Sequence, residues 1–385
     1  MHISTPAPHH PHSILCVVGA RPNFMKMAPI MAALDDVVPE LKVSLVHTGQ
    51  HYDVTMNHQY FEALGIPQPD INLEVGSGSH AVQTADVMRR FEPALDATQP
   101  SAVLVVGDVN STLACALVAA KKGIPVIHVE AGLRSFDRAM PEEINRILTD
   151  QISDLLFITE RSGRENLLRE GIADARIRFV GNVMIDTLRR NLERAVPVNK
   201  ILKDAGKEMS LNGHDYAVLT MHRPSNVDDP NTLRTLLEAV LKISTRLPVI
   251  FPMHPRTRTM IEKFGLSEML NVPELLQLPP MGYLEMLGLM KDARVVLTDS
   301  GGIQEETTAL GVPCITLRNN TERPITVDEG TNTIAGQDPV KILAAFDEIM
   351  RSGGKAGRIP EFWDGQASVR IAAAIHEWLE KGMRC

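Results

Sequence analysis

The segment ARVVLTDSGGIQEE, residues 293–306, passes from an apolar run to a glycine pair and then to a helix-like stretch. The run predicts a buried strand that ends where a helix begins. A helix N-terminus exposes unpaired N–H groups that favour an anion, and Gly301 and Gly302 would let a phosphate approach the backbone. Glu306 follows one turn later on the same face, where a carboxylate suits a sugar diol. The stretch is typical of a nucleotide diphosphate site with a ribose contact. A helix capped by Ser300, with solvated glutamates, is the alternative interpretation.

The same passage from strand to helix recurs through nearly the whole chain. Short apolar runs alternate with stretches of helical periodicity, such as 80–96 and 111–123. This alternation predicts an α/β fold with two doubly wound, Rossmann-like parallel sheets in series. A polar stretch at 195–213 separates them and is expected to be a linker, and an amphipathic helix closes the chain at 367–382. The expected strands are 14–20, 43–49, 101–108, 124–130, 155–159 and 176–182, then 216–222, 247–254, 274–280, 294–300 and 313–318.

The composition of the chain bears on whether it binds nucleic acid, spans a membrane or works in a reducing compartment. The 385 residues carry a formal net charge of -8, which disfavours a nucleic-acid partner. No apolar run reaches the roughly 18 residues that a membrane helix needs, and the N-terminus lacks the pattern of a secretion signal. The cysteines form no CxxC pair, and three of them sit in or beside apolar runs as small core residues, so a reducing, cytoplasmic compartment fits best. The four cysteines are Cys16, Cys115, Cys314 and Cys385.

Two carboxylates end apolar strands in the first half of the chain. Asp108 closes one expected strand and Glu130 closes another, where a charge is costly without a purpose. Adjacent strands would bring both within reach of one site, and the two sheets in series imply a cleft beyond their strand ends. Glu142 and Glu143 begin a helix, where acids are also common for the sake of the helix dipole. Several converging carboxylates favour general acid–base chemistry.

Cations and histidines follow other strands. Arg21 and Lys26 come after the first strand without G-x-G-x-x-G spacing, so they either hold phosphates by charge or are surface charges of a helix. His222 and His254 each follow an apolar strand and precede an arginine, which suits a diphosphate pocket. A metal site is the alternative for the histidines, and no third ligand has suitable spacing.

Eight segments together resemble the non-hydrolysing UDP-N-acetylglucosamine 2-epimerase family. They are GARPNFMKMAPI, HTGQHYD, VVGDVNSTLA, HVEAGLRS, MPEEINRILTD, MHRPSN, TDSGGIQEE and TERP, and they occur in order from about residue 14 to the last helix. The resemblance implies two Rossmann-like domains of glycosyltransferase-B type, with the last helix crossing back onto the first domain. We therefore expect a first domain of 14–195 plus 367–385 and a UDP-binding second domain of 196–366. Before them, Pro6, Pro8 and Pro11 predict a disordered His- and Pro-rich tail at 1–13, with metal binding by its histidines as the alternative.

The resemblance also implies a reaction. Family members interconvert UDP-N-acetylglucosamine and UDP-N-acetylmannosamine by eliminating UDP and adding it back, through 2-acetamidoglucal. No redox cofactor and no metal are expected, and the protein is expected to be a homodimer that binds a UDP-sugar. The positions that match catalytic residues of the family are Asp108, Glu130, Glu142 and His222. Those that match UDP-binding residues are Arg21, Lys26, Ser300, Gly301, Gly302, Glu306 and Arg323.

Two segments depart from the family pattern. The uracil-facing loop, PPMGYLEM, places Met281 and Met286 where other residues are usual. Some members bind a second UDP-N-acetylglucosamine as an activator, and of that segment only Gln50 and His51 match here. These two residues are therefore candidates for an allosteric site.

Other activities remain as alternatives. HTGQHYD and HPRTR are also similar to relatives that epimerise a UDP-2,3-diacetamido sugar acid, whereas TERP is nearer the UDP-N-acetylglucosamine enzymes. A glycosyltransferase of the same fold would need an acceptor site, and the acids at Asp108 and Glu130 favour proton chemistry instead. A non-catalytic UDP-sugar sensor could lose those acids, which this chain keeps. A hydrolysing epimerase typically lacks an opening like RPNFMK.

Overall fold

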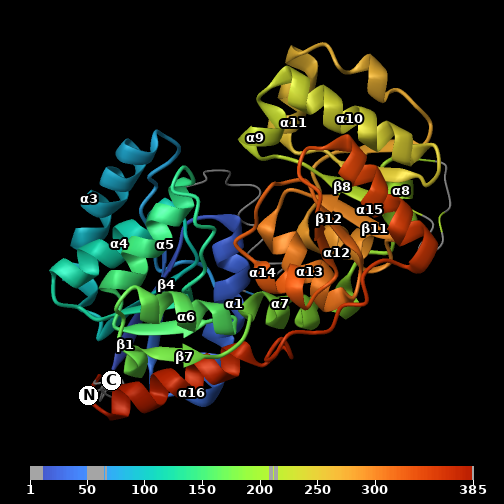
Figure 1. The fold of residues 1–385 in the computed structure, drawn as a ribbon. Coiled ribbons are helices and arrows are strands. Elements are labelled where there is room, and N and C mark those ends of the chain that lie inside the picture. The colour runs from blue at the N-terminus through green and yellow to red at the C-terminus, as the bar shows by residue number, and fades with distance from the viewer. Residues whose placement is uncertain (1–11, 50–64, 66, 208–210, 212–215, 384–385) are drawn as a thin grey trace, which may run out of the picture. The chain divides into compact units, whose positions relative to one another are not determined.

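The computed structural model describes residues 12–49, 65, 67–207, 211 and 216–383 (Figure 1). The chain divides into two compact units, which we call the first unit, Met1–Thr187 with Asp364–Cys385, and the second unit, Leu188–Trp363. Each unit has its own sheet with intervening helices, so the prediction of two Rossmann-like sheets in series is confirmed. The boundaries expected from the sequence, after 195 and 366, lie slightly later in the chain than the observed ones, after Thr187 and Trp363.

The first unit contains a seven-stranded sheet with the order β3-β2-β1-β4-β5-β6-β7. Every pairing is parallel. The strand order reverses between β1 and β4, and ligands of open α/β sheets bind at the carboxyl ends of the strands beside such a reversal. The strands are β1 (Ser13–Val18), β2 (Lys42–His47), β3 (Ile71–Asn72), β4 (Ala102–Val106), β5 (Val126–Ala131), β6 (Leu155–Ile158) and β7 (Ile177–Phe179).

Helices cover both faces of this sheet because successive strand residues point to opposite sides. In β1, Ile14 and Cys16 pack in one apolar cluster, whereas Leu15 and Val17 pack in another on the opposite face. The first cluster contains residues of α1 and α16, and the second contains residues of α3 and α4. The helices in the described part of this unit are α1 (Arg21–Val37), α3 (His80–Thr98), α4 (Asn110–Lys121), α5 (Pro141–Ile152), α6 (Arg161–Arg169) and α16 (Ala367–Glu380), with a 3₁₀ turn η1 (Asp174–Arg176). The α7 helix (Val183–Asn191) begins in the first unit and ends in the second.

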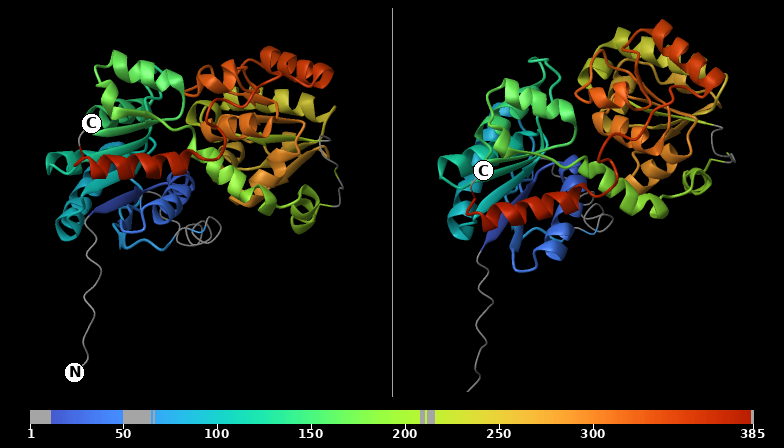
Figure 2. Two further views of the ribbon diagram at one scale, coloured as in Figure 1. Left: turned by 90° about the horizontal axis from the view of Figure 1, so that it is seen from below. Right: turned by 60° about the horizontal axis from the view of Figure 1, so that its bottom comes forward.

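The α16 helix belongs to the first unit although it follows the second unit in the sequence. Figure 2 shows this red helix lying along the first unit. Its Ile371, Ile375 and Trp378 are buried in the same apolar cluster as Phe24 and Met27 of α1. Two distant chain segments therefore build the core of the first unit.

The second unit repeats the architecture with a six-stranded parallel sheet of order β10-β9-β8-β11-β12-β13. Its strand order reverses between β8 and β11. The strands are β8 (Ala217–Thr220), β9 (Val249–Pro252), β10 (Leu275–Leu278), β11 (Val295–Thr298), β12 (Cys314–Thr316) and β13 (Asn332–Ile334). The helices are α8 (Val198–Asp204), α9 (Pro224–Val227), α10 (Pro230–Ser244), α11 (Pro255–Lys263), α12 (Tyr283–Lys291), α13 (Gly301–Leu310), α14 (Pro324–Asp328) and α15 (Pro339–Ser352), with 3₁₀ turns η2 (Leu192–Arg194) and η3 (Glu268–Leu270).

One expectation about the connection between the sheets is wrong, because 195–213 is not simply a linker. The α8 helix lies within this stretch, and its Val198, Ile201 and Leu202 are buried in an apolar cluster of the second unit. These residues have the i, i+3, i+4 spacing of an apolar helix face. Charged neighbours on the other face made the short pattern look weakly periodic.

Candidate active site

Glu130 sits in an unusual backbone conformation at the carboxyl end of β5. Its φ is +76°, in the left-handed region that residues other than glycine rarely adopt. The β5–β6 register shifts at the same point, where Val129 pairs with Phe157 and Ala131 pairs with Ile158. Glu130 is therefore the extra residue of a β-bulge, a device that redirects one side chain. Strain of this kind persists where the surrounding structure enforces it, often at functional sites.

Lys26 of α1 forms an ion pair with the Glu130 carboxylate, and both side chains are buried. The turn that leads from β1 into α1 is fixed by Asn23. Its Oδ1 accepts from the amides of Gly19 (3.2 Å) and Ala20 (3.0 Å), and its Nδ2 donates to the Val106 carbonyl (3.0 Å). The ends of β1 and β4 are thereby tied together, which places Lys26 against β5.

Asp108 follows β4, the strand next to β5. Its Oδ2 accepts from Arg146 Nη1 of α5 at 2.5 Å, and its side chain remains 28% exposed. Asn145 Nδ2 donates to the Asp108 backbone carbonyl at 2.9 Å. The structure therefore brings Asp108, Lys26 and Glu130 to one edge of the first sheet, as the sequence predicts for the two acids.

The adjacent glutamates of α5 have different environments. Glu143 is buried and accepts from Arg146 and from the amides of Ser135 and Phe136. Burial alone would raise the pKa of Glu143, but the Ser135 amide and the Arg146 guanidinium lower it. Glu142, by contrast, is half-buried, and no described residue forms a hydrogen bond or ion pair with its carboxylate. Glu143 is thus a hydrogen-bond acceptor within the fold, whereas the Glu142 carboxylate has no partner among the described residues.

Arg21 is the first residue of α1. Gln50 and His51, the candidates for an allosteric site, lie outside the described residues. These positions stay predictions.

In the second unit, His222 follows β8 and pairs with Asp299, which follows the adjacent strand β11. The distance from His222 Nδ1 to Asp299 Oδ1 is 3.0 Å. Asp299 is fully buried and also accepts from the His222 and Arg223 amides and from Asn226 Nδ2. Burial alone would raise the pKa of Asp299, whereas His222 and the two amides hold it below its usual range.

This pairing fixes how His222 presents its ring. With Nδ1 toward the carboxylate, Nε2 is the nitrogen left to act on a ligand, and the side chain is 38% exposed. The His254 ring lies 5.3 Å from the His222 ring, centroid to centroid. His254 Nδ1 accepts from the Arg256 amide and so caps α11. Asp299 is not among the site residues predicted from the sequence, although it carries a usable signal, a charge directly after a buried strand.

The α13 helix begins at Gly301, immediately after Ser300, and the Ser300 side chain makes no capping bond. The amides of its first turn can therefore meet an anion, as the sequence suggests. Gly301 has a further reason to be glycine: a Cβ there would lie 2.5 Å from Glu322 Oε1. A side chain at 301 would therefore displace the Glu322 carboxylate, so glycine leaves room for this carboxylate independently of any phosphate.

A set of arginines surrounds Glu322. Arg318 Nη2 lies 2.7 Å from Glu322 Oε2, and Arg223 Nη2 lies 3.9 Å from Oε1. Burial alone would raise the pKa of Glu322, but Arg318, Arg323 and Arg223 hold it well below its usual range. Arg323 is buried, and its Nε lies 2.7 Å from Glu305 Oε1. Arg323, the predicted phosphate ligand, thus contacts α13 through its ion pair with Glu305.

Glu306 is buried on α13. Burial raises the pKa of Glu306 to about 8, with the Tyr283 hydroxyl opposing the shift and Glu305 adding to it. No described residue forms a hydrogen bond with Glu306 Oε1. A buried carboxyl with spare acceptor capacity is suited to hydroxyl groups of a ligand. Met281 and Met286 are half-buried and pack against the apolar cluster to which α12 and α13 contribute.

The raised pKa of Glu306 predicts a pH-dependent stability difference. The folded state holds the proton more tightly than the unfolded state, so this contribution is full below about pH 4.5 and is lost as the pH rises through about 8. We expect the free energy of unfolding of the wild type to fall relative to that of Glu306→Gln across this window. Denaturant unfolding from about pH 4 to 9 measures both proteins. The exposed Glu274→Gln is the matched control, and parallel curves for wild type and Glu306→Gln would contradict the prediction.

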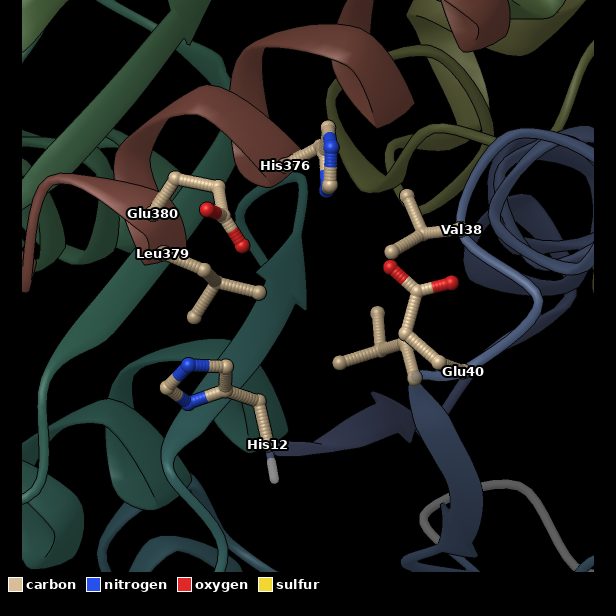
Figure 3. A pocket seen from close by; sticks show the side chains of 7 residues that line it. His12, Val38, Glu40, His376, Leu379 and Glu380 are labelled. Atoms are coloured by element: carbon tan, nitrogen blue, oxygen red, sulfur yellow. The ribbon is translucent and has the colours of Figure 1, made fainter. Parts of the chain in front are cut away.

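No metal site or membrane helix adds to the candidate site residues of either unit in the described part of the chain, and a small hollow does not include them. Among the described residues, no three or more His, Cys, Asp or Glu side chains are arranged to hold a metal ion. No helix in the described part of the chain is both long and apolar enough to span a bilayer. A small hollow of about 20 Å³ in the first unit contains none of the predicted site residues (Figure 3). It is lined by His12, Val38, Glu40, Leu41, His376, Leu379 and Glu380.

Comparison with known sequences identifies relatives along most of the chain. A family model described as UDP-N-acetylglucosamine 2-epimerase matches residues 36–376. A UDP-N-acetylglucosamine 2-epimerase of Methanococcus maripaludis is 44% identical over 344 residues, which are 89% of this chain and 92% of the relative. A UDP-2,3-diacetamido-2,3-dideoxy-D-glucuronate 2-epimerase of Pseudomonas aeruginosa is 41% identical over 371 residues, 93% of this chain and 98% of the relative.

Solved structures agree. The UDP-GlcNAc 2-epimerase of Methanocaldococcus jannaschii, in complex with UDP-GlcNAc and UDP, matches with a TM-score of 0.86 and 40% identity. The match covers 95% of this chain and 99% of the other. Family model, sequence identity and fold lead to one assignment: the chain belongs to the UDP-N-acetylglucosamine 2-epimerase family.

Proposed function

We propose that the protein catalyses reversible C2 epimerisation of UDP-N-acetylglucosamine to UDP-N-acetylmannosamine. The relatives carry this activity in their names. The observation that carries the proposal for this chain is Glu130, which is strained at a β-bulge, buried against Lys26, and one strand from Asp108. Buried carboxylates with cationic partners at a sheet edge are suited to moving a proton. The product would supply N-acetylmannosamine-type sugars for cell-surface polysaccharide.

The reaction needs no net redox change. A base removes the C2 proton, the C–H electron pair forms a C1=C2 bond, and the C1–O bond breaks as UDP leaves. The intermediate is 2-acetamidoglucal. UDP then re-forms the C1–O bond while a proton is delivered to the opposite face of C2. Two faces of one carbon call for more than one acid–base group, and the residues we assign to them are Asp108, Glu130 and Glu142.

The second unit supplies most of the groups suited to UDP, and Arg21 and Lys26 of the first unit add to them. We assign the diphosphate to Ser300 and the first amides of α13, with His222 oriented by Asp299 beside them. Glu306 would accept from the ribose hydroxyls. Arg21, Lys26, His254 and Arg323 are assigned to the phosphates by charge. The loop with Met281 and Met286 is assigned to the uracil.

One experiment tests the reaction. The protein is incubated with UDP-N-acetylglucosamine in deuterium oxide, without any acceptor, and the products are identified by NMR. We expect UDP-N-acetylmannosamine with deuterium at C2. A glycosyltransferase or a sensor would leave C2 protonated, and a hydrolysing enzyme would release free N-acetylmannosamine.

The substrate of the Pseudomonas aeruginosa relative defines the second candidate, because that protein is nearly as similar to this chain. Its sugar carries a second acetamido group and a carboxylate. We propose UDP-N-acetylglucosamine as the better substrate, since the TERP segment is nearer those enzymes. Comparing kcat/KM for the two sugars decides between them, and a higher value for the diacetamido uronate would reverse the assignment.

We also propose a homodimer formed through helices of the first unit, in keeping with the family resemblance. Light scattering at micromolar concentration measures the mass, and a monomeric mass would contradict the proposal. A cytoplasmic location is proposed as well. It is supported by three free cysteines, Cys16, Cys115 and Cys314, each buried in the core as a small apolar residue.

A further inference from the structure

One face of the α5 helix binds residues at or beside the two candidate acids, Asp108 and Glu130. Glu143, Arg146 and Asp150 are buried polar residues with i, i+3, i+7 spacing. Arg146 binds the Asp108 carboxylate directly. Asp150, one turn further along, binds His128 of β5 and does not touch Asp108 or Glu130. The contact between Asp150 and His128 therefore takes no direct part in the reaction proposed above.

His128 is completely buried in the middle of the sheet. Its Nδ1 lies 2.7 Å from Asp150 Oδ1, and its Nε2 lies 2.9 Å from the carbonyl oxygen of Gly107. A carbonyl oxygen can only accept, so Nε2 must donate. The ring therefore connects Asp150 of α5 to the Gly107 carbonyl at the end of β4, and we call this pair of hydrogen bonds the strut.

The Gly107 carbonyl is part of the peptide bond that leads into Asp108. Gly107 has φ +68°, and its amide donates to the Val129 carbonyl at 3.0 Å. Glycine has little conformational preference of its own, so the direction of the chain after it must be set by contacts. A hydrogen bond to its carbonyl fixes the plane of the 107–108 peptide, and hence the direction in which Asp108 leaves the strand.

Asp150 is held firmly enough to anchor this strut. Its Oδ2 accepts from the Gly132 amide at 3.0 Å and lies 2.7 Å from Arg134 Nη2. Burial alone would raise the pKa of Asp150, but His128 and Arg134 lower it, so the group is a carboxylate. Gly132 follows Glu130 by two residues, so the same carboxylate also supports the end of the β-bulge.

We propose that His128 is a positioning residue for proton transfer at C2, acting through the Gly107 carbonyl on the direction of Asp108. This inference rests on the proposed function. A misplacement of an acid–base group by about 1 Å can lower a rate by on the order of 100-fold. A residue that only stabilised the fold would have no such specific effect on the rate.

Two substitutions separate the halves of the strut. In His128→Gln the amide nitrogen takes the place of Nε2, which keeps the bond to Gly107 and loses the bond to Asp150. In His128→Asn the amide nitrogen takes the place of Nδ1, which keeps Asp150 and loses Gly107. Each variant removes one buried hydrogen bond, so both should lose similar stability. We expect His128→Asn to lower kcat for C2 deuterium exchange by about 10- to 100-fold with UDP affinity unchanged, and His128→Gln to restore most of the rate.

The wild type is assayed beside the variants, with UDP titration and thermal melting for each protein. No exchange in the wild type would refute the proposed function itself. Exchange in the wild type, with equal rates in His128→Asn and His128→Gln, would overturn the positioning role. If neither variant folds, Asp150→Asn is the second test, because its amide can donate to Nδ1 while Nε2 still donates to Gly107. A folded Asp150→Asn that binds UDP and exchanges near the wild-type rate supports the proposal, and a loss of about 100-fold overturns it.

Discussion

We expect Glu130→Gln to lower kcat for deuterium exchange at C2 by about 10²–10⁴-fold while UDP still binds, since this is the usual contribution of a general acid or base. The substitution keeps the shape of the side chain and removes its basicity. Asp108→Asn should behave in the same way. UDP should still bind because most of the groups assigned to the nucleotide, among them Ser300 to Glu306, lie in the second unit. Lys26, which pairs with Glu130, is the assigned phosphate ligand that this substitution touches. Deuterium exchange followed by NMR and UDP titration by calorimetry provide the two measurements.

A matched control separates this effect from a change in surface charge. Glu165→Gln removes an exposed carboxylate from α6 in the same unit and should exchange at the wild-type rate. Melting temperatures are recorded for all variants, because Glu130→Gln leaves the buried Lys26 without its charged partner. If Glu130→Gln and Asp108→Asn both exchange normally, Glu142 or His222 becomes the base.

The second large effect concerns stability. Gly132→Ala should lower the free energy of unfolding by roughly 2–5 kcal/mol, from about 1–2 for a left-handed alanine and about 1–3 for overpacking. Gly132 has φ +78°, and a Cβ there would lie 2.5 Å from the Gly163 carbonyl oxygen. The obstacle is backbone at the start of α6, which cannot rotate away as a side chain could.

Gly171→Ala is the control for the backbone term. Gly171 also has a left-handed φ, +85°, but its Cβ would meet nothing within 4 Å. Gly171→Ala should therefore lower the free energy of unfolding only by the cost of a left-handed alanine, about 1–2 kcal/mol. Denaturant unfolding gives both values. Equal losses for the two variants would show that the contact with Gly163 is relieved at little cost.

Much of the fold could be predicted because its strands are buried on both faces. Such strands appear as continuous apolar runs between helical patterns, and each of the eleven expected runs overlaps a strand. The two strands left out, β3 (Ile71–Asn72) and β13 (Asn332–Ile334), have two and three residues at sheet edges. Neither lies in one of the apolar runs given above, unlike β7 (Ile177–Phe179), which is as short and also lies at a sheet edge. The α8 helix was hidden because seven residues give one apolar turn and a half.

The candidate site could be located from the sequence but not assembled. The rule that ligands meet strand ends indicates Asp108, Glu130 and His222 without knowledge of their partners. Which acid meets which cation depends on strand order and on a bulge, and neither is a local property of the chain. Lys26 meets Glu130 only because β1 and β5 both flank β4. His128 and Asp299 carried a usable signal, a polar side chain within or directly after an apolar strand.

The place of α16 in the first unit sets an order of events during synthesis. A ribosome adds about 5–20 residues per second, so the whole second unit emerges before Ile371, Ile375 and Trp378 exist. For a time on the order of ten seconds the nascent first unit lacks part of its core, with the apolar face of α1 uncovered. The second unit has no such gap and can fold as it emerges. A chaperone that shields apolar surface on nascent chains would therefore be needed most by the unit that is made first.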